Sequence, residues 1–237
     1  MVDERFCRTA MLLGEEAVFT LQKSRVMLVG LGGVGGYTCE ALVRAGIGEL
    51  ILVDFDTVSR SNINRQILAD DTTVGRRKTA VAAERIARIS PATRVYPVEQ
   101  FVDTDNAEEL ILTTAPHYII DAIDHVPGKL AIIRAAHKHH IPVISCMGTG
   151  NKLYPEKLQI GDIAKTHTCP LARTMRAKLR REGIDHLDVL WSSEQPRTPV
   201  IPTMEEGRTI PASVSFVPAA AGLMLGGYVV RRLLKID

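Results

Sequence analysis

A glycine-rich turn, GLGGVGG at residues 30–36, stands between an apolar run at residues 25–29 and a segment with helical spacing. In such a turn Gly30 permits a tight bend, Gly32 and Gly33 let the backbone approach phosphates, and Gly35 lets the helix pack against the strand. The free N–H groups at the helix start attract anions. The turn predicts a nucleotide-binding site, but it does not distinguish among NAD, FAD, S-adenosylmethionine and ATP as the ligand.

Strand and helix patterns alternate up to residue 150. We expect one or two short helices within residues 5–23, strands at 25–29, 50–53, 94–98, 118–120 and 142–146, and helices at 34–45, 78–89, 106–113 and 130–139. This alternation is typical of an α/β fold, a Rossmann-like, doubly wound and mainly parallel sheet with flanking helices. Ligands of such sheets bind beyond the carboxyl ends of the strands.

The pattern changes after residue 150, which predicts a C-terminal substrate-side extension. We expect a strand at 157–160, a basic helix at 171–181, and a mobile loop at 182–212 with little periodicity apart from 187–191. Residues 214–230 carry no charge, so a buried or dimer-interface helix is favoured over contact with a membrane. We interpret residues 1–237 as one domain, with a nucleotide-binding core at 5–150 and the extension at 151–237.

Bulk composition narrows the class of protein only slightly. The chain has 237 residues, of which 46% are apolar and 24% charged, and a net charge of +2 that singles out no polyanionic partner. Its four cysteines are scattered with no C-x-x-C pair, so we expect no structural zinc. No charged-then-apolar leader opens the sequence, which makes a cytoplasmic location the expectation.

Polar residues after the second expected strand favour ATP over the other nucleotides. Asp54 stands where a carboxylate can bind ribose hydroxyls, or alternatively where it caps the next turn. Asn62, Arg65 and Lys78 follow. A triphosphate needs cations such as Arg65 and Lys78 on its phosphates because pyrophosphate leaves with high charge. Asp124, after a later strand, is a candidate carboxylate for Mg²⁺ on that triphosphate.

Taken together, these motifs resemble the E1-like (ThiF/MoeB/ubiquitin-activating) adenylating superfamily. The resemblance covers roughly residues 5–150 and rests on the glycine turn, the segment Asp54-Phe-Asp56-Thr-Val, the run 61–66, Lys78 and the segment 121–124. Within that superfamily the chain most resembles the bacterial tRNA threonylcarbamoyladenosine dehydratases. Softer patterns carry this second likeness, among them residues 161–166 and 170–172.

The resemblance implies a role for each matching position. It places Gly33 at the nucleotide, Asp54 on the ribose, Ser61, Asn62, Asn64, Arg65 and Lys78 around the phosphates, Asp56 beside them, Asp124 on Mg²⁺ with His125 next to it, and Arg8 on the ATP of a partner subunit. It also implies ATP-dependent adenylation of a carboxylate, a homodimer, and tRNA carrying threonylcarbamoyladenosine as the partner. A sulfur-relay protein is a further possible partner.

Alternatives remain open for Cys169, for one arginine-rich helix face and for the function as a whole. Cys169 is either an activated thiol, as in ubiquitin-type activating enzymes, or an incidental small residue, which we favour because a dehydratase needs no thioester. The arginines at 173, 176 and 180 share a helix face that either contacts tRNA phosphates or is simply solvated. The rival functions are an activator of a ubiquitin-like sulfur carrier, disfavoured by the missing zinc pairs, and a nicotinamide-binding protein.

Overall fold

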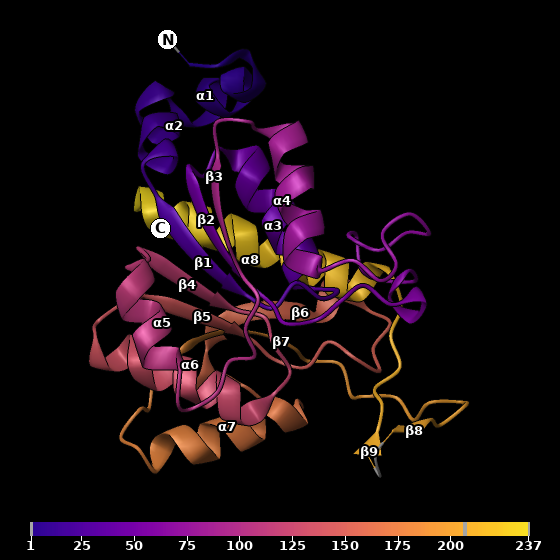
Figure 1. The fold of residues 1–237 in the computed structure, drawn as a ribbon. Coiled ribbons are helices and arrows are strands. Elements are labelled where there is room, and N and C mark those ends of the chain that lie inside the picture. The colour runs from indigo at the N-terminus through magenta and orange to yellow at the C-terminus, as the bar shows by residue number, and fades with distance from the viewer. Residues whose placement is uncertain (1, 206–207, 237) are drawn as a thin grey trace.

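A seven-stranded sheet forms the centre of the molecule in the computed structural model, which describes residues 2–205 and 208–236 (Figure 1). Its strands run in the order β3 (Arg94–Val98), β2 (Glu49–Val53), β1 (Arg25–Val29), β4 (Tyr118–Asp121), β5 (Val143–Cys146), β7 (Asp188–Ser192) and β6 (Leu158–Asp162). All neighbours pair in parallel except β6, which is antiparallel to β7. The expected mainly parallel, doubly wound sheet is confirmed.

Helices cover both faces of this sheet. One face packs against α3 (Gly35–Ala45), α4 (Lys78–Ile89) and α8 (Phe216–Leu234), and the other against α5 (Ala107–Thr114), α6 (Val126–Lys138) and α7 (Pro170–Arg180) (Figure 1). Successive residues of β1 alternate between the two cores, Val26 and Leu28 on one side and Met27 and Val29 on the other. Burial on both sides explains why the strands read as continuous apolar runs.

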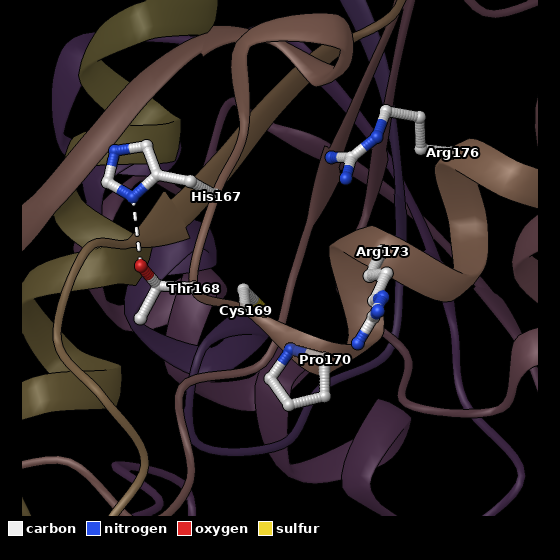
Figure 2. A pocket seen from close by; sticks show the side chains of 6 residues that line it. All are labelled: His167, Thr168, Cys169, Pro170, Arg173 and Arg176. Atoms are coloured by element: carbon white, nitrogen blue, oxygen red, sulfur yellow. Dashed lines mark hydrogen bonds between the residues drawn. The ribbon is translucent and has the colours of Figure 1, made fainter.

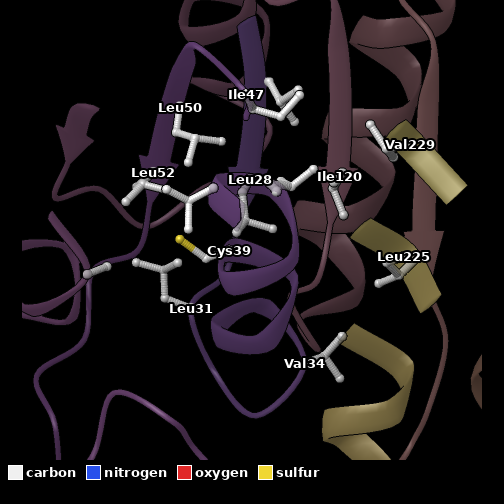
Figure 3. Packing of buried hydrophobic residues seen from close by; sticks show 14 of the residues in the cluster. Leu28, Leu31, Val34, Cys39, Ile47, Leu50, Leu52, Ile120, Leu225 and Val229 are labelled. Atoms are coloured by element: carbon white, nitrogen blue, oxygen red, sulfur yellow. The ribbon is translucent and has the colours of Figure 1, made fainter. Parts of the chain in front are cut away.

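Figure 3 shows how the first of these cores is filled. Leu28 on β1 and Leu50 and Leu52 on β2 point toward Leu31 and Cys39, and Leu225 and Val229 approach from α8. Burial raises the pKa of the Cys39 thiol to about 12, so this cysteine stays protonated and behaves as a small apolar side chain. The core fixes α3, and with it the glycine turn, to the sheet.

Short elements make up the rest of the described chain. At the start come η1 (Glu4–Phe6), α1 (Cys7–Leu13) and α2 (Glu15–Gln22), which confirms short helices before the sheet. The remaining pieces are η2 (Arg60–Asn62), η3 (Pro155–Lys157), η4 (Ile163–Lys165) and the small hairpin β8 (Met204–Glu205) and β9 (Arg208–Thr209). That hairpin projects away from the sheet (Figure 1).

The expectation of a mobile loop over 182–212 is wrong for its first part. Residues 188–192 form β7, which lies inside the sheet and pairs with β5 on one side and β6 on the other. Val189, Leu190 and Trp191 are buried there. Their short apolar run resembles many surface segments, and only pairing with strands distant in the sequence identifies it as a strand.

Helix α6 begins at Val126, four residues earlier than expected. Its N-cap is His125, whose Nδ1 accepts a hydrogen bond from the Gly128 amide at 3.2 Å, and Pro127 fits the first turn because that position needs no N–H donor. The segment after Asp124 is therefore helix rather than loop.

The uncharged C-terminal segment packs closely on α3. A Cβ added at Gly222 would lie 2.3 Å from the Val34 carbonyl oxygen, and one at Gly226 would lie 2.4 Å from Ala41 Cβ. These two glycines let the α3 and α8 backbones approach, which supports a buried helix. By length and composition, α8 is also the one helix in residues 2–205 and 208–236 that meets the criteria for a membrane span.

Candidate functional site

The candidate site lies at the sheet edge where β1, β2 and β4 end. Val29 is in register with Val53 of β2 and with Asp121 of β4. The next backbone amides continue this alignment, because Gly30 N–H donates to the Val53 carbonyl and Ala122 N–H to the Val29 carbonyl, both at 2.8 Å. Register alone therefore brings the glycine turn, Asp54 and the segment leading to Asp124 to one rim.

Two glycines of the turn are required by packing inside the chain. Gly30 has a φ of +93°, and a Cβ on it would lie 2.9 Å from the Ala122 backbone. A Cβ on Gly35 would lie 1.8 Å from the Gly30 carbonyl oxygen, so α3 can start at this point only with glycine. The turn is therefore held close against β4.

The other two predicted glycines differ from each other. Around Gly32 the nearest atom to an added Cβ is Gln66 Nε2 at 3.8 Å, so this backbone is open to a ligand. At Gly33 the added Cβ would lie 3.2 Å from Pro218 Cβ and 3.4 Å from the Arg65 carbonyl oxygen. Gly33 thus packs against the start of α8 and the polar run, while Gly32 offers the free approach.

The Asp54 carboxylate is tied to the glycine turn. Its Oδ2 accepts the Leu31 N–H at 2.6 Å and its Oδ1 accepts the Asp56 N–H at 2.8 Å, and the residue is only 8% exposed. Burial raises the pKa of Asp54, opposed by the nearby Lys78 charge and the two backbone hydrogen bonds. Each oxygen keeps a second lone pair for a ligand hydroxyl, so capping the turn and binding ribose are compatible.

Lys78 starts α4 with its amine directed to Asp56. The Nζ–Oδ2 distance is 2.7 Å, and the backbones are joined by Lys78 N–H donating to the Asp56 carbonyl at 3.1 Å. The lysine side chain is 6% exposed and the aspartate side chain 46% exposed. An ammonium has three donors, so Lys78 keeps capacity for a phosphate beside Asp56.

The polar run at residues 61–66 folds into a turn braced by its own side chains. Asn62 Oδ1 accepts the Ser59 N–H at 3.1 Å, and Arg65 Nη1 donates to the Ser61 carbonyl and to Asn64 Oδ1, each at 2.9 Å. Asn64 also donates to the Ser213 carbonyl at 3.2 Å. These bonds hold the Arg65 guanidinium by one nitrogen, which presets its direction.

Gln66 is a site residue that the sequence analysis did not single out. It is buried, its Nε2 faces Gly32, and its Oε1 has no hydrogen-bond partner in the described part of the chain. A buried polar atom without a partner is costly and is typical of a site that a ligand completes. The sequence signal that could have identified Gln66 is its position as a polar residue directly before the apolar pair Ile67-Leu68. An amide oxygen accepts hydrogen bonds, so it suits a donor on a base or ribose, while the open Gly32 backbone and the Lys78 amine suit phosphates. The residues present are therefore compatible with a nucleoside triphosphate.

Asp124 and His125 stand on the same rim, after β4. Asp124 is exposed and makes no hydrogen bond or ion pair with the residues that the structure describes. The His125 ring caps α6 and lies 4.9 Å from the Phe101 ring. No group of three or more His, Cys, Asp or Glu side chains suited to a metal occurs within 2–205 and 208–236. A cation here would need phosphate oxygens as further ligands.

Asp121 has a structural role in a buried network that the sequence did not reveal. The Lys129 amine lies 3.0 Å from Asp121 Oδ2 and donates to the Ile123 and Cys146 carbonyls at 2.9 and 2.7 Å. Both charged side chains are 0% exposed. Because Ile123 precedes Asp124, Lys129 fixes the loop that carries this exposed carboxylate.

Two other predicted residues do not join the groups around the glycine turn. Arg8 is exposed on α1, which packs on α2 before the amino end of β1, so the chain does not bring it to its own site. Cys169 is 3% exposed at the N-cap of α7. A thiol this buried fits the structural interpretation better than a nucleophile that must meet a protein partner.

Comparisons with a family model, with known sequences and with solved structures all match nearly the full length of the chain. The ThiF family model matches residues 6–236. A tRNA threonylcarbamoyladenosine dehydratase of Bacillus subtilis is 40% identical over 242 residues, covering 98% of this chain and 95% of the relative. The crystal structure of Escherichia coli tRNA N6-threonylcarbamoyladenosine dehydratase in complex with ATP matches with a TM-score of 0.89 at 34% identity, covering 98% of this chain and 94% of that one.

A relative with a different name matches less of the chain. A molybdopterin-synthase adenylyltransferase of Salmonella typhimurium is 40% identical over 133 residues, which cover 56% of this chain and 51% of that protein. This similarity thus covers about half of each chain, whereas the similarity to the Bacillus subtilis protein covers nearly all of both. On its family match and its near full-length similarity, this chain belongs to the ThiF family.

Proposed function

We propose that this protein is an ATP-dependent dehydratase that cyclises N6-threonylcarbamoyladenosine in tRNA. The observation that carries the proposal is the near full-length match to the dehydratases, which includes the region after residue 150. The site supports it because the open Gly32 backbone and the buried Lys78 amine both lie close to Asp54 on the rim, where they suit phosphates. Donors and cations placed in this way stabilise the charge that develops during adenylation.

In the proposed reaction a carboxylate oxygen of the threonyl group attacks the α-phosphorus of ATP. The bond to the bridging oxygen breaks, and pyrophosphate leaves with its electron pair. An internal nitrogen of the substrate then attacks the acyl carbon, loses its proton, and expels AMP. The substrate has lost one water, and ATP has become AMP and pyrophosphate.

The chain contributes positioning and charge. Gly32 presents its backbone to the phosphates, Asp54 accepts ribose hydroxyls, and Arg65 and Lys78 meet the charge that grows on pyrophosphate. Asp124 would hold Mg²⁺ together with phosphate oxygens, since Mg²⁺ commonly takes one or two carboxylates and completes its shell with phosphates and water. These roles require no covalent link to the enzyme.

The decisive test is incubation with ATP, Mg²⁺ and threonylcarbamoylated tRNA, followed by mass spectrometry of the nucleosides. The expected result is a modified adenosine lighter by one water, with AMP formed in equal amount. An unchanged nucleoside would refute the proposal. Pyrophosphate exchange that depends on a ubiquitin-like protein would indicate the sulfur-carrier activity, and tight NAD binding without ATP binding would indicate the nicotinamide class.

The assembly is part of the proposal. We infer a cytoplasmic homodimer of single-domain chains, in which Arg8 of each chain reaches the ATP of the other, supported by the exposed position of Arg8 far from its own rim. A sulfur-relay protein is a further partner that the resemblance implies. Transfer of labelled sulfur from a persulfide-loaded donor protein to this chain would test it.

A further inference from the structure

A cavity of about 270 Å³ opens at the start of α7, outside the proposed nucleotide site. It is lined by His167, Thr168, Cys169, Pro170, Arg173 and Arg176. Figure 2 shows the two arginines on the helix side and the His167–Thr168 pair, whose Nδ1 and Oγ1 are 2.9 Å apart, on the other. The lining set contains two guanidiniums and no carboxylate, so it favours an anion.

Arg176 is fixed in place by the loop before α7. Its Nη1 donates to the Thr166 carbonyl at 2.9 Å and to the Thr166 hydroxyl, and it lies 3.4 Å from the Ile163 carbonyl oxygen. All these acceptors are neutral, so the positive charge is not compensated. Because one nitrogen makes every bond, the rest of the guanidinium keeps its donors while the side chain has already lost its rotamer freedom.

Arg173 lies one helical turn earlier and has no such partners. It is exposed, and its guanidinium makes no hydrogen bond or ion pair with residues 2–205 or 208–236. At the far end of the helix, by contrast, Arg180 lies 3.8 Å from an Asp185 oxygen. Helix α7 thus leaves its positive charge uncompensated at the cavity.

The cavity is close to the proposed reaction site. Gly148 follows β5, and a Cβ added there would lie 3.8 Å from Cys169 Sγ in the cavity wall. Strand β5 pairs with β4, and both end at the rim that bears Asp124. A polyanion whose reactive group is at this rim would pass over the cavity.

We propose that this cavity binds a backbone phosphate of the tRNA substrate near the reactive nucleoside. The inference rests on the proposed function, from which it takes the identity of the polyanion. The guanidinium fork matches two phosphate oxygens, and each phosphate contact releases counterions and makes affinity fall with salt. Arg173 closes on the phosphate while the anchored Arg176 sets its position.

The test compares Arg173→Gln with Arg181→Gln, an equal loss of charge at the opposite end of α7. Fluorescence anisotropy measures binding of a labelled tRNA transcript over a range of salt concentrations, and thermal unfolding confirms that both variants fold. Arg173→Gln should weaken tRNA binding roughly three- to tenfold and reduce the salt slope by about 0.7–0.9. Arg181→Gln should match the wild type in both.

Wild-type affinity and slope in Arg173→Gln would overturn the assignment, as would failure of the wild type to bind the transcript. Competition with inorganic phosphate separates the two phosphate sources. If Arg173→Gln loses sensitivity to free phosphate but binds tRNA normally, the cavity serves free anions and the proposal is wrong. Binding requires no dehydration, so Arg173-dependent tRNA binding without loss of water would refute only the proposed function.

Discussion

At the scale of single residues, Lys78 shows how a buried charge is kept available. Its amine is held 2.7 Å from Asp56, so the fold tolerates the cation before any substrate arrives. Asp56 remains half-exposed, and the pair therefore lies at the border between the core and the rim. A triphosphate would find the ammonium already desolvated and aimed, which strengthens its interaction with developing charge.

Replacing Lys78 with alanine should abolish adenylation, a loss of at least about 100-fold, because the other buried lysines of the described residues, Lys129 and Lys152, donate to backbone carbonyls elsewhere. The fold should survive, since the orphaned Asp56 carboxylate can turn to water. The matched control is Lys138→Ala, which removes an amine paired with Glu108 at the same 2.7 Å distance on α6. ATP-dependent AMP release and the thermal midpoint of both variants check the prediction, and a fully active Lys78→Ala enzyme would contradict the phosphate role.

At the scale of elements, one carboxylate joins three strands. Glu49 at the start of β2 is in register with Arg25 on β1 and Arg94 on β3. It pairs with both, and the Nε of Arg25 lies 2.7 Å from its Oε2. The hydrogen bond from Arg94 holds the pKa of Glu49 below its ordinary value, with burial opposing the shift and Arg25 adding to it.

This arrangement predicts a specific pH dependence of stability. The depressed pKa means that Glu49 stabilises the fold above its unfolded pKa of about 4.3, and that this stabilisation is lost as pH falls through the lower folded pKa. Glu49→Gln should lower the free energy of unfolding by roughly 1–3 kcal/mol at pH 7. The difference in free energy of unfolding between the variant and the wild type should disappear in acid. Urea unfolding at pH 7 and at pH values below 4 measures this difference.

Glu84→Gln serves as the comparison for this experiment. Glu84 also pairs with an arginine, Arg76, but both side chains are well exposed. Its loss should leave the free energy of unfolding nearly unchanged at any pH, because solvent screens an exposed pair. The prediction would be wrong if the two substitutions lowered the free energy of unfolding equally. It would also be wrong if the difference between Glu49→Gln and the wild type persisted in acid.

At the scale of the whole molecule, the two ends of the sheet have separate tasks. The rim with the glycine turn collects the proposed ATP-binding groups, whereas α1 with Arg8 precedes the amino end of β1. One chain therefore does not bring together all the groups assigned to the proposed reaction. A second copy that presents its α1 to this rim would complete the site.

Mixing two inactive variants tests this division directly. In a mixed dimer of Lys78→Ala and Arg8→Ala chains, the Arg8→Ala chain has an intact rim and receives Arg8 from its partner. Subunit exchange should therefore restore up to roughly half of the activity per mixed dimer. If Arg8 acts within its own chain, both sites of the mixed dimer are defective and no activity returns. AMP release after exchange, with each variant alone as the control, distinguishes the two.

The elements with strong local signals were predictable from the sequence. Strands at 25–29 and 94–98 and the helix at 78–89 have the bounds that were expected, because apolar runs and Ser90-Pro91 mark them locally. The segment 188–192 was missed because its place in the sheet depends on β5 and β6, far away in sequence. Arg176 was grouped with a free basic face, yet loop carbonyls bind it, since helical spacing does not reveal what an adjacent loop offers.

By itself the sequence determined the glycine turn, the alternation of strands and helices up to residue 150, and the polar residues after those strands, because backbone geometry and hydrophobic periodicity act over a few residues. Only the tertiary structure decided that Gly32 is open while Gly33 is packed, that Gln66 is left with an unpaired oxygen, and that Lys129 fixes the loop before Asp124. These outcomes depend on which segments, distant in sequence, pack against each other. Because the interior is closely packed, a single neighbouring side chain determines whether a polar atom faces a ligand or the core.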